Sequence, residues 1–242
     1  MGAVTDWDAM TQGIAAQPAE WEPGTRGAYQ SMTMGFMLGE LVRRVDGRAL
    51  PTYFQQEIAG PLGVEYGWGL SEEQVERTAD IVANSGHETL KAFADPSTRL
   101  GRAWHMRPKG AGFYNSDQFR RGVLPSSNGH GNARSVATIF DALLDDRLVK
   151  SETRERMRTL QWDTPCGMTD RPYRYALGFF LSAAPLVPMG PNPRAFGHPG
   201  AGGAIGFADP EAGLSFAYAP NFMCAGEGSG GRCAALVDAL YI

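Results

Sequence analysis

Two short segments carry side chains that can exchange a proton with a substrate. Tyr29, in the run Tyr29-Gln30-Ser31, places a phenol and a hydroxyl on the loop that enters a helix. His198, in the run 197–203 (Gly-His-Pro-Gly-Ala-Gly-Gly), places an imidazole on a glycine-rich turn before a strand. A phenol has an ordinary pKa of about 10, so it acts near neutral pH only beside a cation or a hydrogen-bond donor. The pair indicates acid/base chemistry, although each residue alone is also typical of a loop tyrosine or of a turn histidine bonded to backbone.

Metal and cofactor chemistry is not predicted. The four histidines have no metal-ligand spacing in the sequence. The chain also lacks a Walker loop, a dinucleotide fingerprint, a His-Glu-x-x-His motif and a Gly-x-Ser-x-Gly elbow. We therefore expect no metal and no cofactor.

Charge and composition exclude two classes of partner. The 22 Lys and Arg against 26 Asp and Glu give a net charge of −4, so neither nucleic acid nor an anionic membrane is favoured. The first 16 residues contain no basic residue and do not resemble a signal peptide. No window approaches the roughly 18 apolar residues of a membrane span. Three cysteines favour a reducing compartment, so we expect a cytoplasmic protein, with a Cys224–Cys233 disulfide as the alternative.

The apolar spacing predicts helices early in the chain and short strands late in it. One predicted helix carries an apolar face of Met37, Leu38, Leu41, Val42 and Val45. Another, at 50–60, ends at a Gly-Pro pair, and a C-terminal helix over 234–241 turns two leucines, 236 and 240, inward. Strands are predicted at 175–181, 204–208 and 214–218, with a hairpin loop between the last two.

This order of elements predicts an α+β fold. Residues 1–160 would form a mainly helical region with the tyrosine motif and irregular substrate-side loops over 84–127. Residues 161–242 would form an antiparallel sheet and a C-terminal helix. The character of the chain changes after Gln161, and the family resemblance described below implies that both regions belong to one unit.

Several runs of residues resemble a known family. They lie at 21–25 (Trp-Glu-Pro-Gly-Thr), 28–31, 39–48, 57–63, 128–134, 196–203 and 207–214. Together they resemble the β-lactamase-like serine hydrolases, which include class C β-lactamases, DD-peptidases and family VIII carboxylesterases, and they are most similar to the esterase branch. The resemblance implies a β-lactamase/transpeptidase-like fold and acyl transfer through a serine acyl-enzyme.

The resemblance also implies roles for individual residues. Tyr29 matches the tyrosine that shuttles the proton, and Ser31 occupies the third position of the same motif. His198 to Gly200 occupies the Lys/His-x-Gly position beside the substrate. The N–H of Ala201 would be an oxyanion donor, a contribution of about 3–4 kcal/mol in such sites.

A further loop is implied to approach the substrate. His130, in the run 128–134, would contact the substrate from there, while the same run also caps the helix that follows it. The implied ligand is a small ester or amide.

One family motif is missing from the sequence. The three lysines are preceded at the third position by Glu88, Met106 and Arg147, so no Ser-x-x-Lys occurs. In the family this motif lies upstream of the tyrosine, and the chain is therefore expected to lack the N-terminal third that carries the nucleophile.

Three accounts follow from this departure. The chain is the C-terminal part of a family esterase, truncated and inactive or complemented by an N-terminal fragment, and then prone to homo-oligomerise. Alternatively, it is a short enzyme that uses Tyr29 and His198 in the same cleft. A third account is a non-catalytic binding module that keeps the pocket, including Trp104 and Phe113 of the 84–127 loops.

Overall fold

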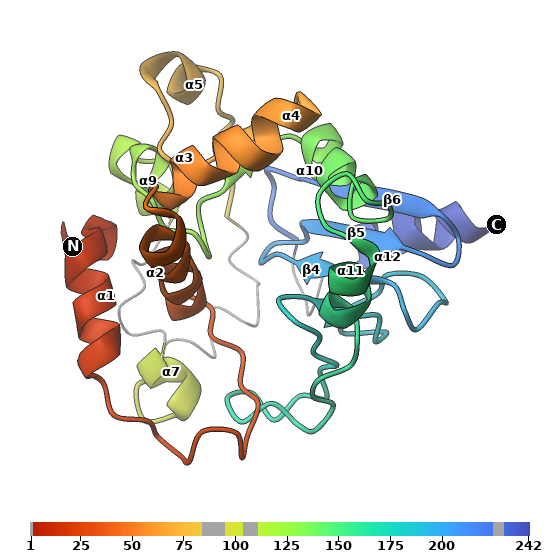
Figure 1. Ribbon diagram of the computed structural model, residues 1–242, viewed down its shortest axis with the longest axis horizontal. Coiled ribbons are helices and arrows are strands. Elements are labelled where there is room, and N and C mark those ends of the chain that lie inside the picture. The colour runs from red at the N-terminus through yellow and green to blue at the C-terminus, as the bar shows by residue number, and fades with distance from the viewer. Residues whose placement is uncertain (1, 84–94, 104–110, 225–229) are drawn as a thin grey trace.

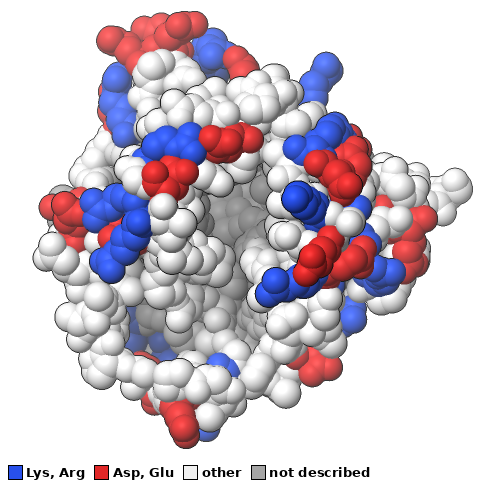
Figure 2. Space-filling view, in the orientation of Figure 1, with Lys and Arg blue, Asp and Glu red and all other residues white. Residues whose placement is uncertain are grey.

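The computed structural model describes residues 2–83, 95–103, 111–224 and 230–242. Trp104 and parts of the 84–127 loops therefore lie outside the described residues. The chain forms a helical half and a sheet half (Figure 1). Figure 2 shows a hollow between them, and on this face most of the visible charged side chains lie around the hollow and on its outer sides.

The described helices are short, and most belong to the first two thirds of the chain. They are α1 (Trp7–Ala16), α2 (Thr33–Asp46), α3 (Leu50–Phe54), α4 (Gly60–Leu62), α5 (Glu72–Glu76), α7 (Arg99–Ala103), α8 (Ala111–Tyr114), α9 (Asp117–Arg121), α10 (Ala133–Asp141), α11 (Ser151–Met157) and α12 (Gly230–Asp238), with 3-10 turns at Gly2–Thr5 and Ala239–Tyr241 and a π turn at Gln55–Ala59.

The strands form two antiparallel sheets. A small one pairs β1 (Tyr66–Gly67) with β2 (His130–Gly131), and a four-stranded one has the order β3 (Phe180–Leu181), β4 (Phe196–Pro199), β5 (Ile205–Asp209) and β6 (Leu214–Tyr218). The predicted α+β arrangement is confirmed.

Strand β5 forms the centre of the core, because both of its faces are covered. All five of its residues are buried. Ile205 and Phe207 pack with Cys233 and Val237 of α12, whereas Ala208 packs in the cluster that includes Phe140 of α10. This alternation is the two-residue period of a strand, and it fixes β4 and its histidine against a rigid neighbour.

In the helical half, α1 packs across α2 through one close contact. The rings of Trp7 and Phe36 lie 5.2 Å apart, and the Trp7 indole N–H donates to Glu40 Oε2 at 3.0 Å. A Cβ at Gly39 would lie 2.5 Å from Trp7 Cη2. Only glycine therefore permits this approach of the two helices.

Two expectations for helices need correction. The helix that begins at Leu50 does not stop at the Gly60-Pro61 pair. A π turn places the Gly60 N–H on Gln55 O, and α4 then continues to Leu62, with Gly63 as its left-handed C-cap. Proline has no N–H to lose at such a first turn. The 84–127 region contains short helices as well as irregular chain.

The C-terminal helix presents a different face from the predicted one. Leu236 and Leu240 are 45% and 39% exposed. Cys233 and Val237 are fully buried and Tyr241 packs beside them. Cys233, Val237 and Tyr241 follow one another at intervals of four residues, so they lie on one face of the helical turns. The buried positions are thus Val237 and Tyr241, each one residue after the leucine that was predicted to face inward.

Candidate active site

Tyr29 and His198 border the same small pocket. Its volume is about 270 Å³ and its surface is mainly apolar. The loop before α2 provides Tyr29, strand β4 provides His198, and strand β3 provides Phe180. The structure thus brings together two residues that are 169 positions apart in the sequence (198 − 29).

Three rings form the wall of this pocket. The Tyr29 and His198 ring centroids are 5.8 Å apart, Tyr29 and Phe180 are 5.9 Å apart, and Phe180 and His198 are 4.9 Å apart. Such tilted contacts fix ring orientation as well as burying area. The phenol and the imidazole are therefore held as neighbours on an apolar support.

His198 lies on strand β4 and not on a turn, which corrects the sequence expectation. It is paired with Gly206 of β5, and a Cβ at Gly197 would lie 2.2 Å from Gly206 O. The glycine-rich run was predicted to be a turn before the strand at 204–208, so β4 (Phe196–Pro199) is an additional strand that the sequence did not predict. Gly197 allows its close pairing with β5.

The protonation of His198 follows from its surroundings. Burial lowers its pKa, and the backbone bond to Pro199 only partly offsets this. Nδ1 lies 2.6 Å from Pro199 O. A neutral ring that donates from Nδ1 keeps its Nε2 lone pair as an acceptor. His198 is accordingly a neutral hydrogen-bond acceptor near pH 7 and not a cation that would activate the phenol.

The backbone of Tyr29 is held by a cysteine that the sequence did not single out. The Tyr29 N–H donates to Cys166 Sγ at 3.3 Å. Cys166 is fully buried. Burial raises the pKa of this thiol, but the neighbouring Thr169 and Tyr175 hydroxyls and two backbone N–H groups outweigh it and lower the pKa overall. No sequence signal marks the contact, because 137 residues separate the partners.

The glycine-rich turn after β4 carries the two backbone positions assigned to oxyanion binding. The N–H of Gly200 donates to Ala204 O at 2.6 Å, and Gly203 donates to Gly200 O at 3.1 Å. The Gly200 amide is therefore already used within the turn. Ala201 lies at the exposed apex of the turn, where its role as a donor remains a prediction.

Ser31 and His130 lie apart from the Tyr29 pocket. Ser31 is half-buried just before α2 and is not among the residues that border the pocket. His130, on β2, borders a different cavity of about 900 Å³. Of the described residues, none borders both cavities. The structure thus does not bring His130 to the Tyr29–His198 pair.

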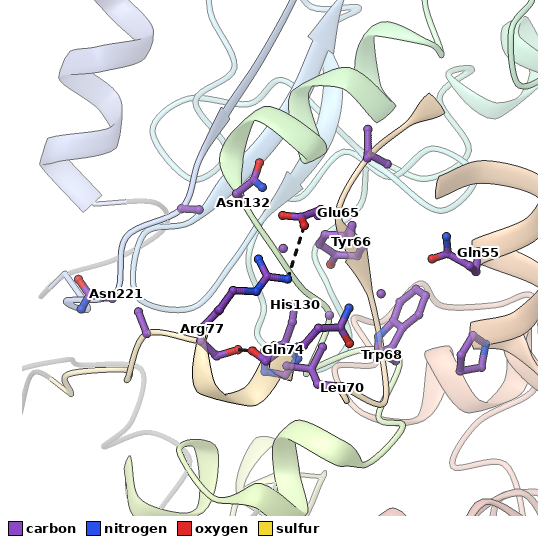
Figure 3. Close-up of a pocket in the computed structure, with 18 of the residues that line it drawn as sticks. Gln55, Glu65, Tyr66, Trp68, Leu70, Gln74, Arg77, His130, Asn132 and Asn221 are labelled. Carbon is purple, nitrogen blue, oxygen red and sulfur yellow. Dashed lines mark hydrogen bonds and ion pairs between the residues drawn. The ribbon is translucent and has the colours of Figure 1, made fainter. Parts of the chain in front are cut away.

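The larger cavity is lined by polar and apolar surface in about equal measure and is bordered by β1 and β2 (Figure 3). Arg77 and Glu65 form an ion pair of 3.5 Å at its edge. Burial lowers the pKa of His130, with Arg120 acting in the same direction and a backbone bond to Asn128 opposing them. His130 is therefore neutral near pH 7.

Other kinds of site receive no support from the described residues. Within that part of the chain, no three His, Cys, Asp or Glu side chains are close enough to hold a metal ion. The same residues include no helix with the length and hydropathy of a bilayer span. The three cysteines are free, so the alternative Cys224–Cys233 disulfide is not formed.

The fold and the paired tyrosine and histidine agree with one class of protein, the β-lactamase-like serine hydrolases. A model of the Beta-lactamase family matches residues 2–230, and the chain belongs to that family. A curated relative, Esterase/beta-lactamase LipL of Mycobacterium tuberculosis (strain ATCC 25618 / H37Rv), is 26% identical over 220 residues, which are 81% of this chain and 48% of the relative.

Solved structures show the same relationship. A family VIII carboxylesterase is 31% identical with a TM-score of 0.87, covering 100% of this chain and 65% of its own. EstA from Arthrobacter nitroguajacolicus Rue61a is 27% identical with a TM-score of 0.85, and the match covers 99% of this chain and 66% of EstA. A penicillin-binding protein homolog from Caulobacter crescentus is 28% identical with a TM-score of 0.85, and the match covers 98% of this chain and 64% of the homolog. The chain thus spans about half of the curated relative and about two thirds of these structures.

Proposed function

We propose that this chain provides the acid/base side of an acyl-transfer site that hydrolyses small carboxylic esters. The observation that carries the proposal is the contact between the Tyr29 and His198 rings, 5.8 Å apart, in a pocket of about 270 Å³. Membership of the Beta-lactamase family and similarity to an esterase/beta-lactamase and to carboxylesterases support the choice of chemistry.

In this mechanism the chain moves protons and another segment provides the nucleophile. A serine oxygen attacks the ester carbonyl and its proton passes to a base, the alcohol leaves with a proton, and water then releases the acid. Tyr29 carries the proton in both directions. His198 accepts a hydrogen bond at Nε2 and orients the phenol, because its Nδ1 is held by Pro199 O. The serine comes from outside these 242 residues, which contain no Ser-x-x-Lys.

The pocket favours a short, uncharged substrate. Its volume lies below the roughly 300–1,000 Å³ of pockets for drug-sized ligands. Met34, Met37, Phe179 and Phe180 line it, and an apolar lining favours an acyl chain over a charged group. A small amide of the same shape is the alternative substrate. The free thiols agree with a reducing compartment, and we propose the cytoplasm.

The test compares the chain alone with the same chain preceded in frame by the segment of the family VIII carboxylesterase that has no counterpart here. Hydrolysis of p-nitrophenyl butyrate is measured for both. We expect turnover only in the joined form, and a loss of about 10²- to 10⁴-fold in kcat on Tyr29→Phe.

The matched control is Tyr53→Phe, which also removes a phenol oxygen. Tyr53 lies on α3, and the Arg48 guanidinium lies over its ring. Unchanged turnover of the joined form after Tyr29→Phe would contradict the proposal. Turnover by the chain alone that Tyr29→Phe abolishes would instead identify a short self-sufficient enzyme, and butyrate-ester binding without turnover in either form would identify a binding module.

A further inference from the structure

The loop that carries Tyr29 has no regular structure of its own. Residues 17–32 connect α1 to α2 and contain neither a helix nor a strand. Such backbone has no ladder of hydrogen bonds, so other parts of the chain must pair its N–H and C=O groups and hold it in place. The position of the Tyr29 phenol therefore depends on the segments that contact this loop.

The turn at 166–170 holds the loop at two points. The Gly167 N–H donates to Gly27 O at 2.9 Å, and the Tyr29 N–H donates to Cys166 Sγ at 3.3 Å. The two bonds lie on either side of a single residue of the loop. The backbone that leads to the phenol is thus fixed only as well as the turn itself is fixed.

An arginine of helix α7 holds this turn from its other side. Arg99 Nη1 donates to Gly167 O at 2.8 Å. Gly167 therefore has its C=O on Arg99 and its N–H on Gly27. Figure 1 shows α7 beside the loop that follows α1.

The same guanidinium also contacts the tyrosine loop directly, near its start. Arg99 Nε lies 3.4 Å from Glu20 Oε2, and Arg99 Cζ lies over the Trp21 ring, 5.6 Å from its centroid. A Cβ at Gly167 would lie 3.6 Å from Trp21 Cη2, so the ring also contacts the turn. One arginine thus joins both ends of the contact, because its planar fork donates in several directions at once.

Helix α7 is short, but its own sequence fixes it. Thr98 Oγ1 accepts the Gly101 N–H at 2.9 Å, and the N–H and hydroxyl of Ser97 both donate to Asp95 Oδ1. The Arg99 side chain is 42% exposed. It is therefore not a packing element of the core, and its hydrogen bond to Gly167 is what it contributes to the site.

We propose that Arg99 is a positioning residue for Tyr29. It does not border the pocket of Tyr29 and His198, and it acts through Gly167, which fixes the loop backbone next to the phenol. The inference rests on the proposed function, in which Tyr29 carries the proton. A displacement of about 1 Å at a reacting group can lower a rate about 10²-fold.

The test compares Arg99→Met with Arg102→Met in the chain alone. Arg102 lies on the same helix and 3.8 Å from the same Glu20, but its Nη1 donates to Ser97 O of its own turn and not to Gly167. Hydrogen exchange of the Tyr29 and Gly167 backbone N–H groups is followed by NMR. We expect about tenfold faster exchange at both groups in Arg99→Met, and no change in Arg102→Met.

The effect on turnover is measured in the joined form described above. Arg99→Met should lower kcat for p-nitrophenyl butyrate by about tenfold and leave KM unchanged, because the pocket lining stays intact. Arg102→Met should change neither constant. Faster exchange with an unchanged kcat would overturn the positioning role.

Three further outcomes decide the proposal. Unchanged exchange at both N–H groups in Arg99→Met would overturn it. Glu20→Gln removes the ion pair and keeps the bond to Gly167, so a full effect from this variant would also overturn it. If Arg99→Met does not melt cooperatively, Arg99→Lys replaces it. A single ammonium cannot bond to Gly167 O and Glu20 with the geometry of the fork, and unchanged exchange in that variant would count equally against the proposal.

The two measurements keep this inference separate from the proposed function. A joined form without turnover would contradict the proposed function. The exchange rates in the chain alone would still show whether Arg99 holds the loop of Tyr29, because they require no chemistry.

Discussion

The backbone N–H of Tyr29 donates to the Sγ atom of Cys166 at 3.3 Å. Cys166 lies in the loop between α11 and β3, so this bond joins the tyrosine loop of the helical half to a loop of the sheet half. The neighbouring Gly167 N–H donates to Gly27 O at 2.9 Å. The two contacts fix the backbone of the loop that carries the Tyr29 phenol.

Removing the Cys166 acceptor is expected to weaken the fold locally. Cys166→Val leaves the Tyr29 N–H without its buried acceptor, which costs about 1–3 kcal/mol of unfolding free energy. Cys166→Ser keeps an acceptor and should lose less. Urea denaturation followed by tryptophan fluorescence measures both. If valine and serine destabilise equally, the sulfur contributes packing only.

The stability of the protein is expected to fall in mild acid because of His198. Its folded-state pKa is lowered by burial, so the unfolded chain takes up the proton first. The contribution of the neutral ring is fully present above pH 6.5, the ordinary value, and is lost as the pH falls through the lower folded-state pKa.

Melting temperatures at pH 7.5, 6.0 and 5.0 test this point, with His198→Asn as the variant. The variant should lose less stability than the parent between pH 7.5 and 5.0. It should keep some pH dependence, because burial also lowers the pKa of His130. Parallel pH curves for parent and variant would show that His198 is already solvated.

Glu40 is expected to govern a second transition at lower pH. Hydrogen bonds from Arg43, Trp7 and Arg44 lower its pKa from 4.5 to about 2. The stabilisation is present above pH 4.5 and is lost as the pH falls towards 2. Glu40→Gln should flatten the stability curve in that window, as followed by circular dichroism at 222 nm. A variant that unfolds along the parent curve would assign the transition to other carboxylates.

The sequence singled out Tyr29 and His198 together, but it did not point to the contacts around them. Tyr29 and His198 stand in motifs whose family order is visible in the chain, and the structure brings their rings together. The Cys166 contact could not be predicted, because it is a long-range backbone bond to a side chain without a motif. The sequence could not predict that His130 borders the larger cavity and not the Tyr29 pocket, because the strand β2 that places it has two residues and is too short to show an alternating hydrophobic pattern.

The buried face of the C-terminal helix was also predicted wrongly, because tertiary packing against the sheet decides which face is buried. The 3.6-residue period identified the C-terminal helix, but it could not distinguish the Leu236 and Leu240 stripe from the Cys233 and Val237 stripe beside it. Small or moderately sized residues fit against Ile205 and Phe207 of β5. Which stripe is buried was decided by the shape of the sheet.

The contact between α1 and α2 yields a prediction with an internal control. Gly39→Ala places a methyl carbon 2.5 Å from Trp7 Cη2, and overpacking of this kind costs about 1–3 kcal/mol. Gly13→Ala, in the interior of α1, meets no atom within 4 Å and should stabilise the helix by about 0.5–1 kcal/mol. The two variants add the same methyl group to two helices that pack on each other, but only the one at Gly39 meets a neighbour. Opposite signs in urea denaturation would therefore isolate the Trp7 contact. A neutral Gly39→Ala would mean that α1 can move away from α2, and the rotation of α2 about its axis would then have to be fixed by another contact.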